Sequence, residues 1–224
     1  MIVDLAPLWL SLRLAFFATL VLLLIGTPLA WWLAMTKARV KPFVEAVTAL
    51  PLVLPPTVLG FYLLILFSPN APVGGFFVSL TGQSLAFSFF GLVVASVIYS
   101  LPFMVQPLQS AFEGVGRGPL EAAASLGASP LDRFLSVASP LALRGYITGV
   151  VLSFAHTLGE FGVVLMVGGN IPGRTKVISI AIYENVETLD YAQAHWLSAI
   201  LMGFSFAVLV FVFTVNRRFP VKVI

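Results

Sequence analysis

The sequence predicts an all-α membrane protein with five transmembrane helices. Hydrophobic residues make up 59% of the 224-residue chain, whereas charged residues make up only 9%, and the mean hydropathy is +1.04. A soluble domain carries about 25% charged residues because its surface must be solvated. Long stretches without any charge and a one-sided distribution of Lys and Arg complete the pattern. Lipid is therefore the expected solvent of most of this chain.

The charge-free stretches set the number and the position of the spans. A helix crosses the hydrocarbon core of a membrane with about 20 apolar residues. Residues 14–36 form one charge-free stretch, and the stretch between Glu45 and Glu113 is long enough for two crossings joined by a turn-rich loop, 68–84. Two more apolar segments flank a polar stretch, 168–190. Within a single domain, 1–224, the predicted spans are about 8–35, 43–67, 85–109, 141–167 and 192–215.

Lys and Arg lie mainly on one side of this five-span topology. Only Arg13, Arg174 and Lys176 fall on the other side. Loops that stay in the cytoplasm are enriched in Lys and Arg, so the N-terminus is expected outside and the C-terminus in the cytoplasm. An odd number of spans requires the same arrangement. The nine cytoplasmic cations are Lys37, Arg39, Lys41, Arg117, Arg133, Arg144, Arg217, Arg218 and Lys222.

The cytoplasmic segment 113–139, between spans three and four, contains two helix starts. Pro119 suits the first position of a helix that has Glu121 in its first turn. Gly127 can end that helix in a left-handed conformation. Ser129 is then a second N-cap, followed by Pro130 and by Asp132 at the capping-box position. The pattern predicts a short helix, a glycine bend and a second short helix.

Apolar residues recur at roughly helical spacing along this segment, so part of it must pack against another surface. That surface could be the ends of the protein's own helices or a groove in a partner, and the residues alone leave both interpretations open. The apolar residues are Leu120, Leu126, Leu131, Phe134 and Leu135.

The same segment resembles the EAA loop of ABC importer permeases. Glu121-Ala122-Ala123 is followed after three residues by Gly127 and, nine residues later, by Val137-Ala138-Ser139-Pro140. The family pattern ends in Ile-X-Leu-Pro, so Val137 and Ser139 depart from it. The resemblance extends over nearly the whole chain and implies the core of a type I importer permease, in which this loop docks into a cleft of the ATPase subunit. It implies coupling roles for Glu121, Ala122, Ala123, Gly127, Leu131 and Arg133.

Three other motifs narrow the resemblance to molybdate permeases: the run Pro51–Gly60, the run Leu158–Gly162 and the run Gly169–Thr175. Sulfate permeases share the Gly-Glu-Phe/Tyr-Gly part but usually lack the proline-rich run in this form, so sulfate or thiosulfate is the alternative to molybdate or tungstate. His156-Thr157 is a departure, because relatives commonly have Arg there. The resemblance implies a multi-pass protein of the prokaryotic inner membrane that forms the pathway for an oxyanion.

The resemblance also implies partners: two copies of an ABC ATPase, a second copy of this chain, an external solute-binding protein and membrane lipid. The chain contains no Gly-Lys dipeptide and hence no Walker A phosphate loop, so it is not expected to be an enzyme. ATP and Mg²⁺ belong to the ATPase partner. Cysteine is absent, which excludes thiolate metal sites. No metal site, no cofactor of its own and no nucleic-acid partner are expected.

Pro51, Pro55 and Pro56 lie inside predicted span two. Each removes a backbone donor and disfavours a straight helix. In lipid, the carbonyl groups freed in this way must be satisfied by the protein itself or by water in a cavity. The three prolines therefore predict a kink. It can be purely structural, or it can also shape the translocation pathway and its gate.

Glu160 is the only formally charged residue within the apolar part of predicted span four. His156 lies one turn earlier on the same helical face, close enough to pair with it. Gly159 and Gly162 flank Glu160 and are expected to permit close helix approach. Intramembrane carboxylates usually face the bundle interior or a cavity. We interpret Glu160 as a packing group near the gate, because a negative charge is a poor ligand for an oxyanion.

A proton-coupled secondary transporter is the alternative class, with His156 and Glu160 as a proton relay. Such transporters are commonly built from two inverted repeats, and five spans do not divide into equal halves. An intramembrane enzyme is a third class. It is disfavoured because Cys is absent and the two His residues lie in different spans. Neither alternative explains the Glu-Ala-Ala segment.

Overall fold

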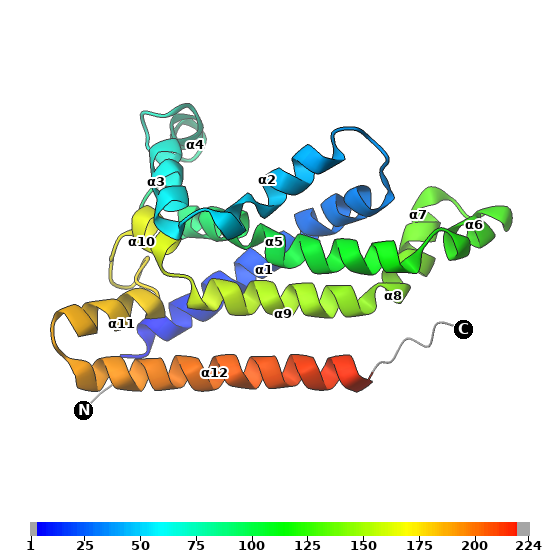
Figure 1. The fold of residues 1–224 in the computed structure, drawn as a ribbon. Coiled ribbons are helices and arrows are strands. Elements are labelled where there is room, and N and C mark those ends of the chain that lie inside the picture. Colours follow the sequence, from blue (N-terminus) through cyan, green and yellow to red (C-terminus); the bar gives the residue numbers. More distant parts are fainter. Residues whose placement is uncertain (1–3, 219–224) are drawn as a thin grey trace.

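The computed structural model describes residues 4–218, and every regular element in that range is helical. Three long helices form the centre: α1 (Ala6–Met35), α5 (Phe89–Val115) and α9 (Leu143–Gly159). Each packs against the other two, as Figure 1 shows. Their shared core is apolar, and Leu14, Leu22, Met104 and Leu108 are at most 1% exposed within it. Predicted spans one and three each correspond to one continuous helix, although α5 begins and ends several residues later than predicted.

Small residues on α9 allow its close approach to α5. Gly145, Gly149 and Ser153 recur every four residues and are all buried. A Cβ atom at Gly145 would lie 2.4 Å from the Cβ atom of Ala111, and one at Gly149 would lie 3.0 Å from the Sδ atom of Met104. In lipid there is little hydrophobic drive between helices, so close backbone packing of this kind supplies much of their attraction.

Predicted span two is not one helix. It consists of α2 (Lys41–Val53) and α3 (Pro56–Phe67), which are bent by 111° relative to each other. Leu54 is extended, with φ −71° and ψ 136°, because the residue before a proline is pushed out of the helical region. Pro55 then continues the extended backbone. The predicted kink is confirmed, but it is a complete break at the Leu54–Pro55 step.

Predicted span four is also interrupted. Its residues fall into α8 (Ser139–Leu141), α9 and α10 (Gly162–Gly168), with a break after Gly159. Glu160 is extended, with φ −64° and ψ 135°, and Phe161 precedes α10. Placing Glu160 inside a continuous helix was therefore wrong: it caps the end of α9. A second bend, of 72°, separates Pro130–Leu141 from Leu143–Gly159.

Two predicted connecting segments contain helices of their own. The loop 68–84 holds α4 (Pro72–Thr81), and the polar stretch after span four holds α11 (Ile178–Glu187). Helix α11 is amphipathic and buries Ile178, Ile180 and Ala181 between α1 and α12. The burial of these apolar side chains stabilises a helix within an otherwise polar stretch of sequence.

The last helix, α12 (Tyr191–Arg218), lies on the outside of the bundle against α9 and α11. Met202, Phe206 and Val210 remain exposed along it, as expected for a face that meets lipid or another chain. Lys222, one of the cations used to orient the chain, lies outside the described residues.

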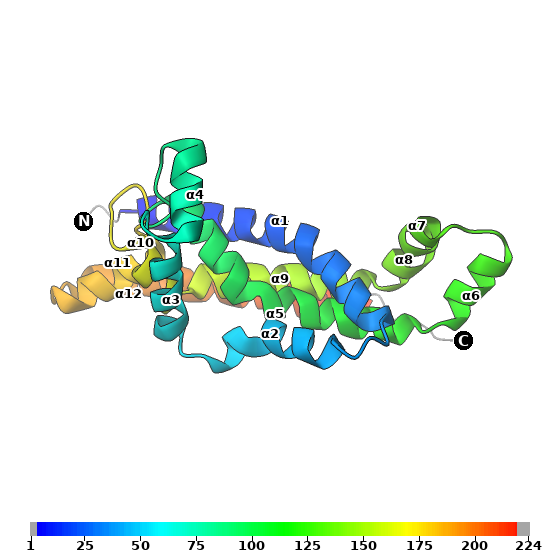
Figure 2. The same cartoon turned by 90° about the horizontal axis from the view of Figure 1, so that it is seen from above.

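Within the described chain, α1, α5 and Tyr191–Phe211 are long and apolar enough to cross a membrane, and up to five spans result if each bent pair counts as one. Helices α3, α4, α10 and α11 lie at one end of the long helices, and α6 (Gly118–Ser125), α7 (Pro130–Asp132) and α8 at the other (Figure 1 and Figure 2). Helix α1 begins at the first end and α12 finishes at the second (Figure 1).

Replacement of Gly145 with alanine is expected to destabilise the bundle. The new methyl group would overlap Ala111 and approach the Pro107 carbonyl oxygen at 2.9 Å, so α9 must move away from α5. Overpacking of this kind costs about 1–3 kcal/mol. Gly203→Ala on α12 is the matched control, because a Cβ atom there meets nothing within 4 Å. Thermal unfolding in detergent should show a lower midpoint for Gly145→Ala alone; equal midpoints for the two variants contradict the packing argument.

Candidate functional site

The segment 113–139 forms the helical pair that the sequence predicts. Helix α6 ends in a left-handed turn at Gly127, whose φ is +87°, and the Ala128 amide donates to the Ala123 carbonyl at 3.0 Å. The Ser129 hydroxyl accepts from the Asp132 amide at 3.2 Å and caps α7. The reciprocal half of the capping box is absent here: the Asp132 carboxylate accepts from Ser136 instead. A π-helix, Arg133–Ala138, then leads into α8.

The apolar residues of this segment divide into an inner and an outer set. Leu120 is buried, and the ring of Phe134 lies 5.2 Å from that of Trp31, centroid to centroid. Leu126, Leu131 and Leu135 are 90%, 66% and 56% exposed. The inner set holds the segment on its own bundle, so the second interpretation, docking to a partner, can apply only to the outer set.

The six predicted coupling residues follow the same division. Glu121, Ala122, Gly127 and Leu131 are exposed, whereas Ala123 and Arg133 are half-buried. The exposed residues therefore form the part of the segment that is free to contact another protein.

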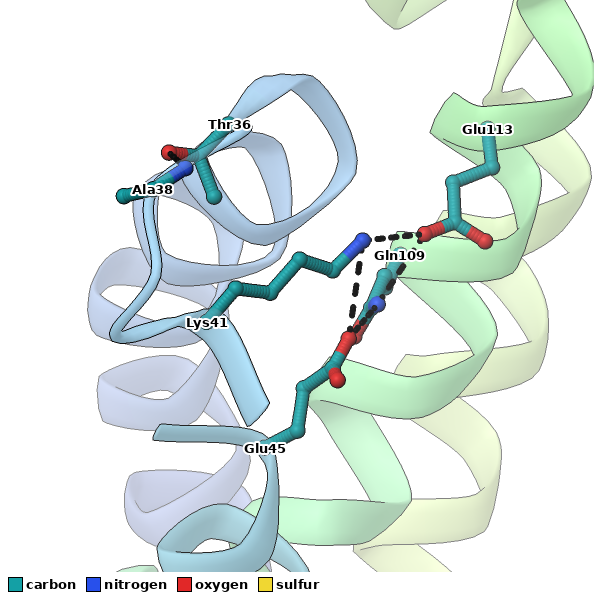
Figure 3. A network of polar contacts seen from close by, with 6 residues as sticks. All are labelled: Thr36, Ala38, Lys41, Glu45, Gln109 and Glu113. Carbon is teal, nitrogen blue, oxygen red and sulfur yellow. Dashed lines mark hydrogen bonds and ion pairs between the residues drawn. The ribbon is translucent and has the colours of Figure 1, made fainter. Parts of the chain in front are cut away.

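A polar network fastens α2 to α5 close to the start of this segment (Figure 3). Lys41 Nζ lies 3.6 Å from Glu45 Oε1 and 3.3 Å from Glu113 Oε1. Gln109 Nε2 donates to the same two oxygens at 2.7 and 3.1 Å. The sequence analysis missed this network, although Glu45 and Glu113 are the two charges that bound its longest apolar stretch. Their position at the same end of two neighbouring spans was the available signal.

The two helix breaks meet in space. A Cβ atom at Gly162 would lie 2.8 Å from the Cβ atom of Pro56, and one at Gly60 would lie 2.8 Å from the Cβ atom of Met166. Helices α3 and α10, which follow the two breaks, therefore pack directly on each other. The expected close approach is confirmed at Gly162 and is wrong at Gly159, which is exposed and has no atom within 4 Å of its Cβ position.

The three prolines of predicted span two occupy different surroundings. Pro51 is buried inside α2, Pro55 is exposed at the break, and Pro56 is half-buried at the start of α3. Only Pro56 touches the α10 side of the pair. Pro56 thus lies next to Gly162, whereas Pro51 lies inside α2 and Pro55 lies at the bend.

His156 and Glu160 do not pair. His156 Nδ1 shares a hydrogen bond of 2.9 Å with Ser100 Oγ, which also bonds Thr157 Oγ1 at 2.9 Å, and the imidazole stacks on Phe103 at 4.0 Å. The ring of His156 is thereby held toward α5. Glu160, one residue past the end of α9, makes no hydrogen bond or ion pair with this ring through its carboxylate.

Glu160 is 4% exposed, and neither of its carboxylate oxygens has a hydrogen-bond partner within the described chain. Its backbone carbonyl, in contrast, accepts from the Ser179 hydroxyl at 2.5 Å. The buried carboxylate marks the junction of α9 and α10 and is separate from the His156 contacts.

Comparison with known proteins places these features in a family. The model of the family described as binding-protein-dependent transport system inner membrane component matches residues 26–219. The molybdenum transport system permease protein ModB of Azotobacter vinelandii is 56% identical over 216 residues, which are 96% of this chain and 95% of that protein. The sulfate transport system permease protein CysT of Salmonella typhimurium is 33% identical over 214 residues, 96% of this chain and 77% of that protein.

A solved structure supports the same fold. The crystal structure of a bacterial ABC transporter involved in the import of the acidic polysaccharide alginate superimposes with a TM-score of 0.77, covering 96% of this chain and 79% of that chain at 15% identity. The family match includes the cytoplasmic segment and both helix breaks. The chain therefore belongs to the family of binding-protein-dependent transport system inner membrane components.

Proposed function

We propose that this chain is the permease subunit of an ATP-driven importer and forms the membrane pathway for a tetrahedral oxyanion, with molybdate as the first substrate and tungstate as its close analogue. The observation that carries the proposal is the 56% identity to a molybdenum permease over 96% of this chain. A sulfate permease of comparable coverage is only 33% identical, which makes sulfate the second candidate.

The proposed topology has five crossings, with the N-terminus outside. Its support is the alternating direction of α1, α2, α5, α9 and α12 along the bundle (Figure 1). The nine-to-three distribution of Lys and Arg supports the same orientation. In this arrangement α2 with α3, and α9 with α10, each make one broken crossing.

The proposed contact with the ATPase uses the outer residues of the cytoplasmic segment. Leu126, Leu131 and Leu135 offer apolar side chains to a groove, and the inner residues transmit the movement of the segment to the bundle. Phe134 lies against Trp31 and Phe112, so a shift of the π-helix Arg133–Ala138 acts directly on α1 and α5. The network of Lys41 with Glu45, Gln109 and Glu113 extends this connection to α2.

The proposed gate is the packed pair of α3 and α10. Both helices follow a break, so both can turn relative to the spans that carry them, while Gly60 and Gly162 keep them together. One chain encloses little of a channel, and we propose that a second copy completes the pathway. The exposed apolar face of α12 is available to lipid or to that copy.

A proton-coupled mechanism lacks its central contact. Proton transfer between His156 and Glu160 requires hydrogen-bond distance or one intervening water. His156 instead bonds Ser100 and stacks on Phe103. This arrangement favours the ATP-driven importer over the secondary transporter.

The substrate proposal is tested by uptake. The permease, reconstituted in proteoliposomes with its ATPase and an external binding protein, is expected to accumulate radiolabelled molybdate only with internal ATP. Unlabelled tungstate should compete at the same concentration as molybdate, and sulfate should need far more. Equal competition by sulfate would support the second candidate, and uptake driven by a proton gradient without ATP would contradict the importer.

Gly127→Val is expected to uncouple the ATPase. The φ of +87° is strained for a residue with a branched Cβ, at a cost of at least about 1 kcal/mol. We expect substrate-stimulated ATPase activity to fall about fivefold or more, with normal membrane insertion. Gly127→Asn, which tolerates this conformation better, should retain more activity, and Gly118→Ala should be neutral because its Cβ meets nothing within 4 Å. Full stimulation in the Val variant would argue against a coupling role.

Glu160→Gln is expected to retain transport within about threefold and to keep the thermal stability of the complex or raise it. The reason is that the carboxylate is buried without a hydrogen-bond partner in the described chain, and an unpaired buried charge is costly. Transport is measured from pH 5 to pH 9 at matched complex levels, with His156→Gln in parallel. If Glu160→Gln abolishes transport in an intact complex, a titrating role for Glu160 is supported instead.

A further inference from the structure

The three cations that the sequence places on the outer side come together in the structure. Arg13 of α1 lines two adjoining hollows at the end of the bundle that carries α4 and α10. The larger has a volume of about 390 Å³ and is also lined by Arg174, Gln83 and Ser84. The smaller, of about 180 Å³, is lined by Asp4 and Lys176 in addition to Arg13. We call the larger one the Arg13–Arg174 hollow.

The charges around the Arg13–Arg174 hollow are not balanced by the chain. Two guanidinium groups line it and no carboxylate does. Lys176, in the smaller hollow, is ion-paired with Glu184, and this hydrogen-bonded ammonium holds the pKa of the Glu184 carboxyl below its ordinary value. Asp4 accepts a hydrogen bond from the Ala6 amide at 2.9 Å. Neither arginine has a carboxylate within ion-pair distance among the described residues.

The backbone that carries Arg174 is fixed from within. Thr175 is fully buried; its hydroxyl donates to the Gly168 carbonyl at 2.7 Å and accepts from the Ile171 amide at 3.2 Å. Gly173 completes the turn with a φ of +72°. These contacts tie the turn to the end of α10, so the position of Arg174 is coupled to the proposed gate.

The other residues around the Arg13–Arg174 hollow are also held in place by contacts within the chain. The Arg13 guanidinium lies 5.4 Å from the centroid of the Phe89 ring, a cation–π arrangement that keeps it over the start of α5. The Phe87 amide donates to the Val167 carbonyl at 2.9 Å, and the Ser88 hydroxyl caps α5 by accepting from the Gly91 amide at 3.0 Å. The linker that contributes Gln83 and Ser84 is therefore anchored to α10 and α5.

We propose that the Arg13–Arg174 hollow binds a tetrahedral oxyanion at the outer end of the permease, before the anion enters the pathway. Two guanidinium groups match the charge of a dianion, and the planar fork of each can donate two hydrogen bonds to its oxygens. The Gln83 amide and the Ser84 hydroxyl supply neutral donors. The polar residues that line the hollow come from α1 and from two outer segments, 82–88 and 169–177.

Weak binding is what such a position requires. A site along a conduction pathway must attract an ion strongly enough to enter and release it easily enough to proceed. Both arginines are exposed, so water screens their charge and limits their affinity. That the bound anion is also the transported one rests on the proposed function. The phosphate of an anionic lipid headgroup has the same chemistry and is the competing source of a ligand.

The test uses the permease–ATPase complex in nanodiscs of phosphatidylcholine, with tungstate as the probe, measured by equilibrium dialysis and metal analysis. The expected result is a tungstate equivalent per permease chain that binds at least about tenfold more weakly in Arg13→Gln/Arg174→Gln. Arg39→Gln, which removes a cation at the other end of the bundle, should leave it unchanged. Equal tungstate binding by the wild type and the double variant overturns the proposal, whatever the outcome of the uptake assay.

A second arm replaces part of the phosphatidylcholine with phosphatidylglycerol. Retention of the Arg-dependent tungstate binding in both lipid mixtures supports a free oxyanion as the ligand. If tungstate does not bind in phosphatidylcholine and the arginines instead enrich phosphatidylglycerol around the complex, the hollow is a headgroup site and the proposal is overturned. Arg-dependent tungstate binding by a complex that fails to import molybdate supports the site and rejects only the proposed substrate.

Discussion

The backbone groups at the two ends of the short apolar helix α10 have no helical partners, and the contacts that satisfy them fix the segments around this helix. Lipid offers no hydrogen bonds, so the freed groups must find partners within the protein. The Glu160 carbonyl accepts from Ser179, the Val167 carbonyl from the Phe87 amide, and the Gly168 carbonyl from Thr175. The segments before α5 and after α10 thus lie where they do because they close the ends of a short helix.

Helix α10 also packs on α3, the helix that follows the break at Leu54–Pro55. Helices α3 and α10 are each too short to span a membrane alone, and each gains a close neighbour at a glycine: Gly60 against Met166, and Gly162 against Pro56. Side chains at either glycine would separate the pair. The result is a closely packed pair that follows extended residues at Leu54, Pro55 and Glu160 and also rests on α5.

The other end of the bundle is built differently. There the segment 113–139 is ordered by a left-handed glycine, a serine cap and the contact of Phe134 with Trp31. Leu126, Leu131 and Leu135 stay exposed because the inner residues already hold the segment in place. An element ordered before it meets a partner loses little conformational entropy on docking, which favours a firm mechanical contact.

The sequence by itself determined the apolar solvent of the protein, the existence of α1, α5 and α12, and the caps at Gly127 and Ser129. These features depend on composition and on contacts within a few residues along the chain, which short-range stereochemistry decides. The family resemblance, confirmed by the comparisons, came from motifs of the same local kind. The sequence also located a kink at the prolines of span two but not its angle.

Only the tertiary structure decided which distant groups meet. His156 and Glu160 are four residues apart and were expected to pair, yet the Glu160 carboxylate has no hydrogen-bond partner in the described chain, and His156 bonds Ser100, 56 residues away. Lys41 and Glu113 meet across 72 residues, and Arg13 meets Arg174 around a shared hollow. No local pattern encodes these contacts, because they depend on the angles at which whole helices pack and on the two breaks that set those angles.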